Sequence, residues 1–116
     1  MNSKKTGTAY EIIAANYLKE QGVQIIEMNY RISQGEIDII GKEKDVLVFI
    51  EVKYRKNASY GQPWEAILMK KRRKICYVAK QYMYAKKWKG QIRFDVISIC
   101  GNEIHWFPNA FEGYSY

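Results

Sequence analysis

The sequence has few of the residues that metal-binding and secreted proteins commonly use. Its 116 residues include one histidine, His105, and two cysteines, Cys76 and Cys100. The cysteines lack a metal-binding spacing, and a single histidine excludes histidine-rich zinc sites and paired-histidine catalysis. Any catalysis would therefore depend on carboxylates and lysines. Both cysteines are expected to be free thiols in a reducing cytoplasm.

Long apolar runs are also missing. No run approaches the roughly 18 residues of a membrane-crossing helix, and the first five residues are not followed by the apolar segment of a signal peptide. We therefore expect a cytoplasmic protein with no membrane partner. A chain of 116 residues with 47% apolar content is typical of one domain, residues 1–116, built around one core.

Acidic residues are scarce relative to basic ones. Nineteen Lys and Arg face twelve Asp and Glu, which gives a formal charge of +7. This charge favours a polyanionic partner, most often nucleic acid, although a basic surface that only maintains solubility is the alternative. Since no helix-turn-helix, zinc finger or other base-reading motif is visible, such a partner would be recognised by shape rather than by sequence.

Residues 46–53 predict the strand around which the rest of the chain is organised. They are rich in β-branched and aromatic residues. Both faces are apolar for most of the length, so a central strand covered on both sides is expected. One face nevertheless ends in Glu51 and Lys53. Two charges at the end of a buried strand are costly unless something compensates them.

The periodicity of the remaining sequence predicts two helices and four more strands. The helices are expected at 4–21, stopped by Gly22, and from Trp64 to Gly90. The other strands are expected at 23–32, 36–40, 92–99 and 103–107, with turns at 33–35 and 42–45, a loop at 54–63 and an irregular tail at 108–116. The first three strands form an antiparallel meander. The expected fold class is therefore α/β, with a mixed sheet of about five strands flanked by two helices.

Asp38 and Glu51 form the first candidate site. Asp38 shares a face of its strand with Glu36 and Ile40, while Ile37 and Ile39 form the other face. Asp38 and Glu51 lie at comparable distances on either side of the 42–45 turn, and cross-strand neighbours on one face approach within about 5 Å. Two carboxylates that close repel each other unless a divalent cation lies between them. Alternatively, the two acids point to opposite faces and each pairs with a base.

Two helical residues have two interpretations each. Glu11 lies at the edge of the apolar stripe of the first helix, where a solvated flank residue is the simpler interpretation. Lys71 lies four residues from both Ile67 and Ile75, so it should point towards the sheet. It is either a lysine that reaches solvent along an apolar surface or an active-site group. Asp95 is expected to be a buried structural acid paired with an arginine.

The neighbours of Lys71 are basic, and most of them are expected to face solvent. They are Lys70, Arg72, Arg73 and Lys74. They either contact phosphates or form a solvated surface. Three aromatic residues further along the helix, Tyr77, Tyr84 and Trp88, either join the core or contact unpaired bases.

The element order and the spacing of Asp38, twelve residues, then Glu51-Val52-Lys53 resemble the PD-(D/E)XK nuclease fold. The blocks at 35–40, 49–55, 60–61 and 93–96, together with Lys71, are similar to those of the YraN-type family. This uncharacterised bacterial family has an expected endonuclease-like structure, similar to archaeal Holliday-junction resolvases. The resemblance covers nearly the whole chain. It departs at Ile37, where the name-giving motif has proline, and at Leu68, where a hydroxyl residue is expected.

The resemblance implies a Mg²⁺- or Mn²⁺-dependent endonuclease that acts on nucleic acid, with branched or otherwise structured DNA as the expected substrate and a homodimer as one expected state. Asp38, Glu51 and the Val52 carbonyl would hold the metal, and Lys53 would orient water or stabilise the transition state. It also moves Glu11 from a flank residue to a candidate site residue and places Lys71 at the scissile phosphate. The expected nucleic-acid contacts are Arg31, Arg55, Lys70, Arg72, Arg73 and Lys74. The alternative is a non-catalytic nucleic-acid-binding module with the same fold.

Overall fold

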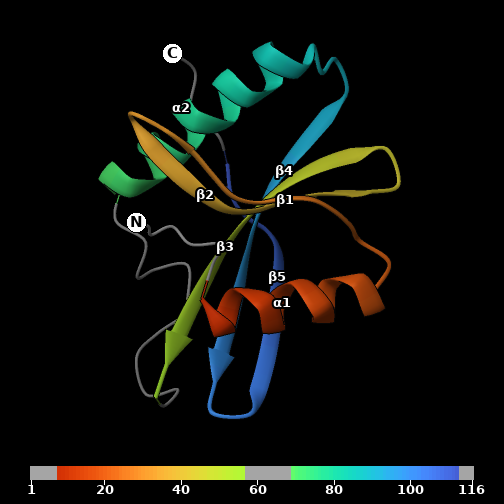
Figure 1. Cartoon of the computed structure of the whole chain (residues 1–116), viewed down its shortest axis with the longest axis vertical. Helices are drawn as coiled ribbons and strands as arrows, with labels where there is room; N and C mark the ends of the chain where they lie inside the picture. Colours follow the sequence, from red (N-terminus) through yellow and green to blue (C-terminus); the bar gives the residue numbers. More distant parts are fainter. Residues whose placement is uncertain (1–7, 57–68, 113–116) are drawn as a thin grey trace.

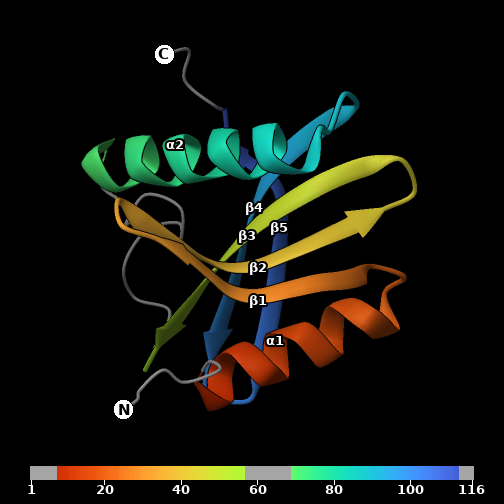
Figure 2. The same ribbon diagram turned by 45° about the horizontal axis from the view of Figure 1, so that its top comes forward.

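A computed structural model describes residues 8–56 and 69–112. It contains a five-stranded sheet with one helix on each face, as Figures 1 and 2 show. In chain order the elements are α1 (Ala9–Glu20), β1 (Gln24–Ile32), β2 (Gly35–Glu43), β3 (Val46–Arg55), α2 (Met69–Lys86), β4 (Gln91–Cys100) and β5 (Glu103–Phe111). This confirms the α/β fold class and the αβββαββ order predicted for a restriction-endonuclease-like core.

The strands lie in the sheet in chain order, β1-β2-β3-β4-β5. Strands β1, β2 and β3 form the predicted antiparallel meander. Strands β3 and β4 are parallel because α2 carries the chain back across the sheet between them. The sheet is therefore mixed, as predicted.

Strand β3 is the central strand, and its two faces belong to two separate cores. Val48 and Ile50 pack with α1 residues, whereas Leu47 and Phe49 pack with α2 residues. All four side chains are at most 2% exposed. Glu51 follows on the α2 side by strand alternation, so a charged group enters a layer that is otherwise apolar.

Helix α1 begins later than the predicted residue 4. Thr8 has extended backbone angles (φ −88°, ψ 169°) and is the N-cap. Its Oγ1 accepts from the Glu11 N–H at 3.3 Å, and the Glu11 carboxylate accepts from the Thr8 N–H at 2.9 Å. This capping box fixes the helix start at Ala9. At the other end Gly22 has φ +98°, which agrees with its predicted role as helix stop.

Helix α2 ends at Lys86 rather than at Gly90. Lys87 has φ +56°, the left-handed conformation. Its N–H donates to the Tyr84 carbonyl at 3.2 Å, and the Trp88 N–H donates to the Met83 carbonyl at 2.9 Å. These two bonds form a Schellman closure with a lysine where glycine is usual. The expected helix start at Trp64, and Ile67 and Leu68, lie outside the described residues.

Four strands run further than the sequence predicts, β4 by only one residue at each end. Strand β2 continues past Gly41 because the hairpin to β3 needs only Lys44 and Asp45, with Lys44 at φ +55°. Strand β3 continues into the expected loop, since Arg55 still pairs with β4. Strand β5 extends to Phe111 although an irregular tail was expected from residue 108, because its pairing with β4 resumes beyond an irregularity.

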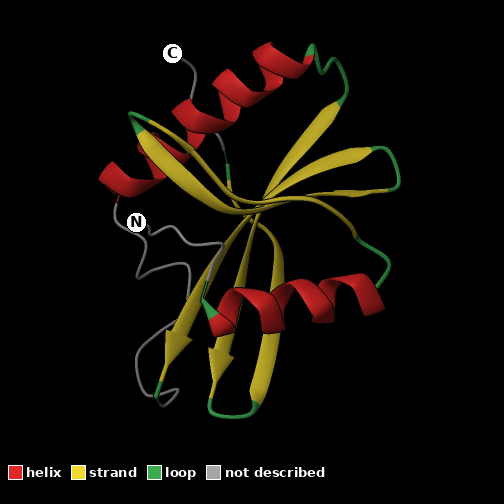
Figure 3. Ribbon diagram, viewed as in Figure 1, coloured by secondary structure: helices red, strands yellow, loops and turns green. Residues whose placement is uncertain are grey.

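The alternation of side chains along β2 breaks near Asp38. The expectation that Ile37 and Ile39 share a face is wrong, because Ile37 packs in the α2-side core and Ile39 in the α1-side core. The pairing of β2 with β3 ends at Ile39 and Ile50, while its pairing with β1 continues to Gly35. The start of β2 thus leaves β3 and turns towards α2, as Figure 3 shows. A Cβ on Gly35 would lie 3.2 Å from the Val78 side chain.

Asp95 is the buried structural acid that the sequence predicts. It is 0% exposed. The Arg93 guanidinium donates to both carboxylate oxygens at 2.9 Å, the Trp106 indole N–H donates at 2.9 Å, and the Asn109 N–H donates at 2.8 Å. These bonds tie β4 to the irregularity in β5. The two cysteines are free thiols, and neither helix of the described part is long and apolar enough to cross a membrane.

Candidate functional site

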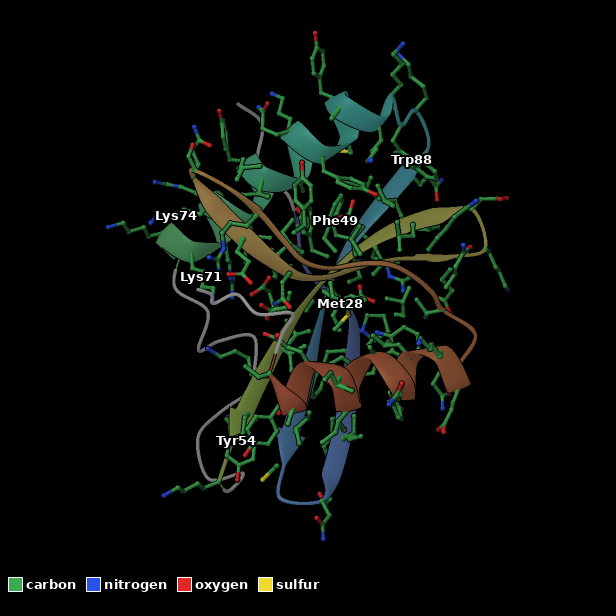
Figure 4. All side chains as sticks on the ribbon, viewed as in Figure 1. Met28, Phe49, Tyr54, Lys71, Lys74 and Trp88 are labelled. Atoms are coloured by element: carbon green, nitrogen blue, oxygen red, sulfur yellow. The ribbon has the colours of Figure 1, made fainter. Side chains whose placement is uncertain are left out.

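A pocket of about 430 Å³ lies where β2 leaves β3, next to the first turns of α2. Its lining combines acidic and basic side chains with one apolar one: Gly35, Glu36, Asp38, Glu51, Lys70, Lys71, Lys74 and Ile75. Figure 4 shows Lys71 and Lys74 at this end of α2. The pocket therefore brings together Asp38, Glu51 and Lys71, three residues that are far apart in the sequence.

Asp38 and Glu51 occupy this pocket together because of the strand register. The pairs Ile39–Ile50 and Ile40–Phe49 place Asp38 opposite Glu51 one step beyond the last paired residues. The Val52 N–H, which lies past the end of that pairing, donates to Asp38 Oδ2 at 2.9 Å. The backbone of β3 thus holds the Asp38 carboxylate at the pocket wall.

Glu51 is a buried carboxylate whose negative charge is only partly compensated. It is 2% exposed. Its Oε1 lies 3.6 Å from Lys71 Nζ, whereas its Oε2 is buried without a hydrogen-bond partner among the described residues. Burial raises the pKa of Glu51 well above its usual value, the Asp38 charge raises it further, and Lys71 opposes both effects. A buried carboxylate with an unpaired oxygen is costly unless a cation or a proton satisfies it.

The pKa of Asp38 is raised as well. Burial raises the pKa of Asp38 to about 6, and the nearby Glu11 carboxylate adds to this. The hydrogen bond from Val52 N–H and the charge of Lys71 lower the Asp38 pKa, but they do not cancel the increase. Two neighbouring carboxylates with raised pKa values indicate a site short of positive charge.

Glu11 reaches this site from α1 through a hydrogen-bond network. Asn29 Nδ2 donates to Glu11 Oε1 at 2.9 Å and to Glu36 Oε2 at 3.0 Å. Arg31 forms an ion pair with the other Glu36 oxygen at 2.8 Å. Thr8 and Asn29 therefore both donate to Oε1 of Glu11 and fix its carboxylate close enough to Asp38 to raise the pKa of Asp38. Glu11 itself is not among the residues that line the pocket.

Sequence reasoning missed Asn29. It lies in the middle of β1 with φ +53°, and its Oδ1 is buried without a partner among the described residues. Asparagine is a poor strand former and tolerates the left-handed region better than most residues do. An asparagine inside a predicted strand is therefore the signal that would have indicated this position.

The structure separates the two candidate lysines. Lys71 points from α2 towards the sheet, as its helical spacing predicts, with its side chain 51% exposed and its ammonium facing Glu51. Lys53 is half-buried on β3, two residues after Glu51. It is absent from the pocket lining, and no ion pair joins it to another residue in the described part of the chain.

The expected nucleic-acid contacts differ in position. Lys70 and Lys74 line the pocket beside Lys71, and Arg73 is exposed. Arg72 departs from the expected solvent-facing run, because it is half-buried with its guanidinium 5.4 Å from the Phe111 ring centroid. The other two expected contacts lie elsewhere. Arg31 forms an ion pair with Glu36, and Arg55 is half-buried at the end of β3.

The donor atoms of the pocket suit a hard divalent cation. Asp38 and Glu51 provide carboxylate oxygens, and Oε2 of Glu51 has no partner among the described residues. The third carboxylate of the lining, Glu36, is already bonded to Asn29 and Arg31. Within residues 8–56 and 69–112, no three His, Cys, Asp or Glu side chains are grouped as metal ligands. A cation here would complete its shell with backbone oxygen and water, as Mg²⁺ usually does. The residues present therefore fit Mg²⁺ or Mn²⁺ better than a softer metal.

The fold and the pocket define an α/β protein whose sheet opens at a site lined by three carboxylates and three lysines. The model of the family described as "Uncharacterised protein family UPF0102" matches residues 10–99, and the chain belongs to this family, the YraN family of the predicted resemblance.

Similar proteins occur in several bacteria. A UPF0102 protein of Lachnoclostridium phytofermentans is 47% identical over 116 residues and covers 98% of both chains. A UPF0102 protein of Clostridioides difficile is 44% identical and covers 96% of this chain and 100% of its own. Among solved structures, a crystal structure of SSO0001 is 13% identical with a TM-score of 0.47, covering 90% of this chain and 50% of that one.

Proposed function

We propose that this protein is a metal-dependent endonuclease that hydrolyses phosphodiester bonds in nucleic acid, with branched or otherwise structured DNA as the expected substrate. The observation that supports this best is the pocket that places Asp38 and Glu51 beside three lysines. Lysines alone would suffice to bind phosphate. The buried carboxylate of Glu51 and the half-buried one of Asp38 would repel a phosphate unless a cation compensates them, so their presence favours metal-assisted hydrolysis over simple binding.

In this proposal Asp38, Glu51 and the Val52 carbonyl hold Mg²⁺ or Mn²⁺. A bound ion of this kind polarises a phosphate and lowers the pKa of a coordinated water. The Val52 N–H keeps one Asp38 oxygen in place, so the other is available to the ion. The unpaired Oε2 of Glu51 supplies a second oxygen at no cost in broken hydrogen bonds.

The lysines and Glu11 act around this centre. Lys71, whose Nζ lies 3.6 Å from Glu51 Oε1, lines the pocket and would contact a phosphate oxygen there. Lys53 orients the attacking water or stabilises charge that develops on the phosphate. Glu11, held by Thr8 and Asn29, would be the residue to hold a second ion or a water of the first.

The likeness of the family to archaeal Holliday-junction resolvases suggests the substrate. Those enzymes cut two strands symmetrically as two-fold dimers, so we propose a homodimer acting on branched DNA. The basic surface supports nucleic acid in general and carries no base-reading element among the described residues.

One observation favours a second candidate function, a nucleic-acid-binding module without cleavage. Lys71 already compensates part of the Glu51 charge without a metal, and Lys53 does not line the pocket. A pocket stabilised in this way could bind a phosphate through Lys70 and Lys74 alone.

Cleavage of labelled four-way, flap, single-stranded and linear DNA in Mg²⁺, Mn²⁺ or EDTA separates the two functions. We expect metal-dependent cutting that Asp38→Asn and Glu51→Gln reduce at least 100-fold, on the order of the loss of a key electrostatic group. Lys19→Ala, an exposed change at the far end of α1, serves as the charge control. Cutting that survives both carboxamide variants would contradict the site, and tight binding without any cutting would favour the binding module.

A further inference from the structure

A second pocket, of about 590 Å³, lies where α2 ends. Its lining comes from one short segment: Met83, Tyr84, Ala85, Lys87, Trp88 and Lys89. Figure 4 places Trp88 at the opposite end of α2 from Lys71 and Lys74. This pocket offers two aromatic rings and two lysines with no acid in its lining, so its chemistry differs from that of the carboxylate pocket.

The two aromatic rings of this pocket have different roles. Trp88 is fixed, because its indole N–H donates to the Gln91 carbonyl at 3.1 Å and Lys42 Nζ lies 5.9 Å from its ring centroid. Tyr84 is 83% exposed, whereas the other exposed large apolar side chains of the described residues are 38–50% exposed. When a flat apolar group stacks on a ring that is exposed to water, the free energy of the system falls.

The backbone of Lys87 provides an independent observation. Lys87 occupies the C′ position of the Schellman closure with φ +56°, where glycine is usual because a side chain is unfavourable in this conformation. Glycine at this position would relieve the strain but would remove an ammonium group from the pocket wall. The residue with the strained backbone, Lys87, is therefore also one of the two lysines that line this pocket.

The charge around this pocket favours a polyanion. Residues 66–94 contain ten of the nineteen Lys and Arg and no Asp or Glu. Three of them, Lys86, Lys87 and Lys89, lie at this end of α2. Lysines attract phosphates, and an exposed tyrosine ring stacks on an unpaired base. An acidic peptide would satisfy the lysines but would leave the Tyr84 ring without a stacking partner.

We propose that the Tyr84–Trp88 pocket binds one unpaired nucleotide, with its base stacked on Tyr84 and its phosphate near Lys87 and Lys89. This inference rests on the proposed function and narrows its substrate class. Tyr84 follows Lys71 by thirteen residues, which is about 20 Å along a helix. At 3.4 Å per nucleotide, that distance corresponds to roughly six nucleotides. Because this distance is the rise along the helix axis, the substrate is then DNA in which unpaired bases begin at least about six nucleotides from the phosphate in the carboxylate pocket.

Binding measured in EDTA tests this site without cleavage. The probes are a labelled duplex with a single-stranded thymidine tail and a blunt duplex with the same number of phosphates. We expect Tyr84→Ala to weaken binding of the tailed duplex by roughly 5- to 100-fold and to leave the blunt duplex unchanged. Tyr84→Phe keeps the ring and should bind as the wild type does. Lys19→Ala is the charge control.

Lys87→Gly separates binding from folding. Because glycine relieves the left-handed strain, this variant should melt at a higher temperature than the wild type and yet bind the tailed duplex more weakly. Equal losses for both duplexes, or no loss for Tyr84→Ala, overturn this inference and leave the nuclease proposal intact. Tighter binding of polyglutamate than of tailed DNA would assign the pocket to an acidic protein. A wild-type protein that binds no DNA would overturn the proposed function as well.

Discussion

Replacement of Asp38 by asparagine should stabilise the protein at neutral pH in the absence of divalent metal. Asparagine keeps the shape of the side chain and can still accept the hydrogen bond from the Val52 N–H. It removes a half-buried charge that lies near Glu51 and near Glu11. Most substitutions at a half-buried, hydrogen-bonded position destabilise a protein, so an increase in stability would be a specific sign of charge repulsion.

The size of this effect follows from the raised pKa of Asp38. Burial moves that pKa from 3.8 to about 6 in the folded protein. Between these values the folded state binds more protons than the unfolded state, so the free energy of unfolding falls as pH rises through this window. Roughly two pKa units correspond to an upper limit of about 3 kcal/mol above pH 7. The partial exposure of Asp38 reduces this figure through solvent screening.

Urea unfolding at pH 5 and pH 8, with EDTA or with Mg²⁺, measures the effect. In EDTA the wild type should lose stability from pH 5 to pH 8, and Asp38→Asn should lose less, because the buried Glu51 with its raised pKa still contributes a loss in both proteins. Mg²⁺ should stabilise the wild type at pH 8 in proportion to occupancy of its site, and should leave Asp38→Asn nearly unchanged. Asp45→Asn, an exposed acid in the β2–β3 turn, is the matched control. Equal stabilisation of Asp38→Asn and wild type by Mg²⁺ would refute the assignment of Asp38 to the metal.

Further substitutions test other parts of the structure by the same unfolding measurement. Thr8→Ala removes the N-cap of α1 and should cost about 1 kcal/mol, while Thr8→Ser should restore most of it. Asp95→Ala leaves Arg93 and Trp106 without their shared partner and should cost about 3–5 kcal/mol; a loss below 1 kcal/mol would show that this network is dispensable. Lys71→Met removes the cation facing Glu51, so its stability deficit relative to wild type should be larger at pH 8 than at pH 5; an equal deficit would contradict the ion pair.

The sheet and its helices were predictable because their signals are local. Alternation along residues 46–53 identified the central strand, and the spacing of Ile75, Val78 and Tyr82 identified the buried face of α2. The ends of the elements were less predictable. Lys87 ends α2 in a conformation that its residue type does not favour, and β5 extends past Pro108 because Asp95, on the neighbouring strand, accepts from the Asn109 N–H. The first is a local backbone closure that residue type does not reveal, and the second is a tertiary contact that a single segment does not encode.

The candidate site was predictable only in part, for the same reason. The spacing of Asp38 and Glu51 around a short hairpin places them near each other in any antiparallel register close to the observed one. The contribution of Asn29 depends on its left-handed backbone and on contacts with Glu11 and Glu36 from two other elements. No periodic pattern in the sequence reports such a three-element contact.

The break in alternation at Asp38 explains why the pocket can exist in so small a sheet. Asp38 lies on the α2 side of β2, as Ile40 does, so in an unbroken ladder its carboxylate would be enclosed in the α2-side core beside a residue that is 0% exposed. Instead the pairing of β2 with β3 ends at Ile39, the start of β2 turns towards α2, and the Val52 N–H bonds to the Asp38 side chain. The same departure from regular pairing that opens the sheet therefore also supplies the donor that fixes Asp38. Restoring the ladder would close the pocket and bury an acid without its partner.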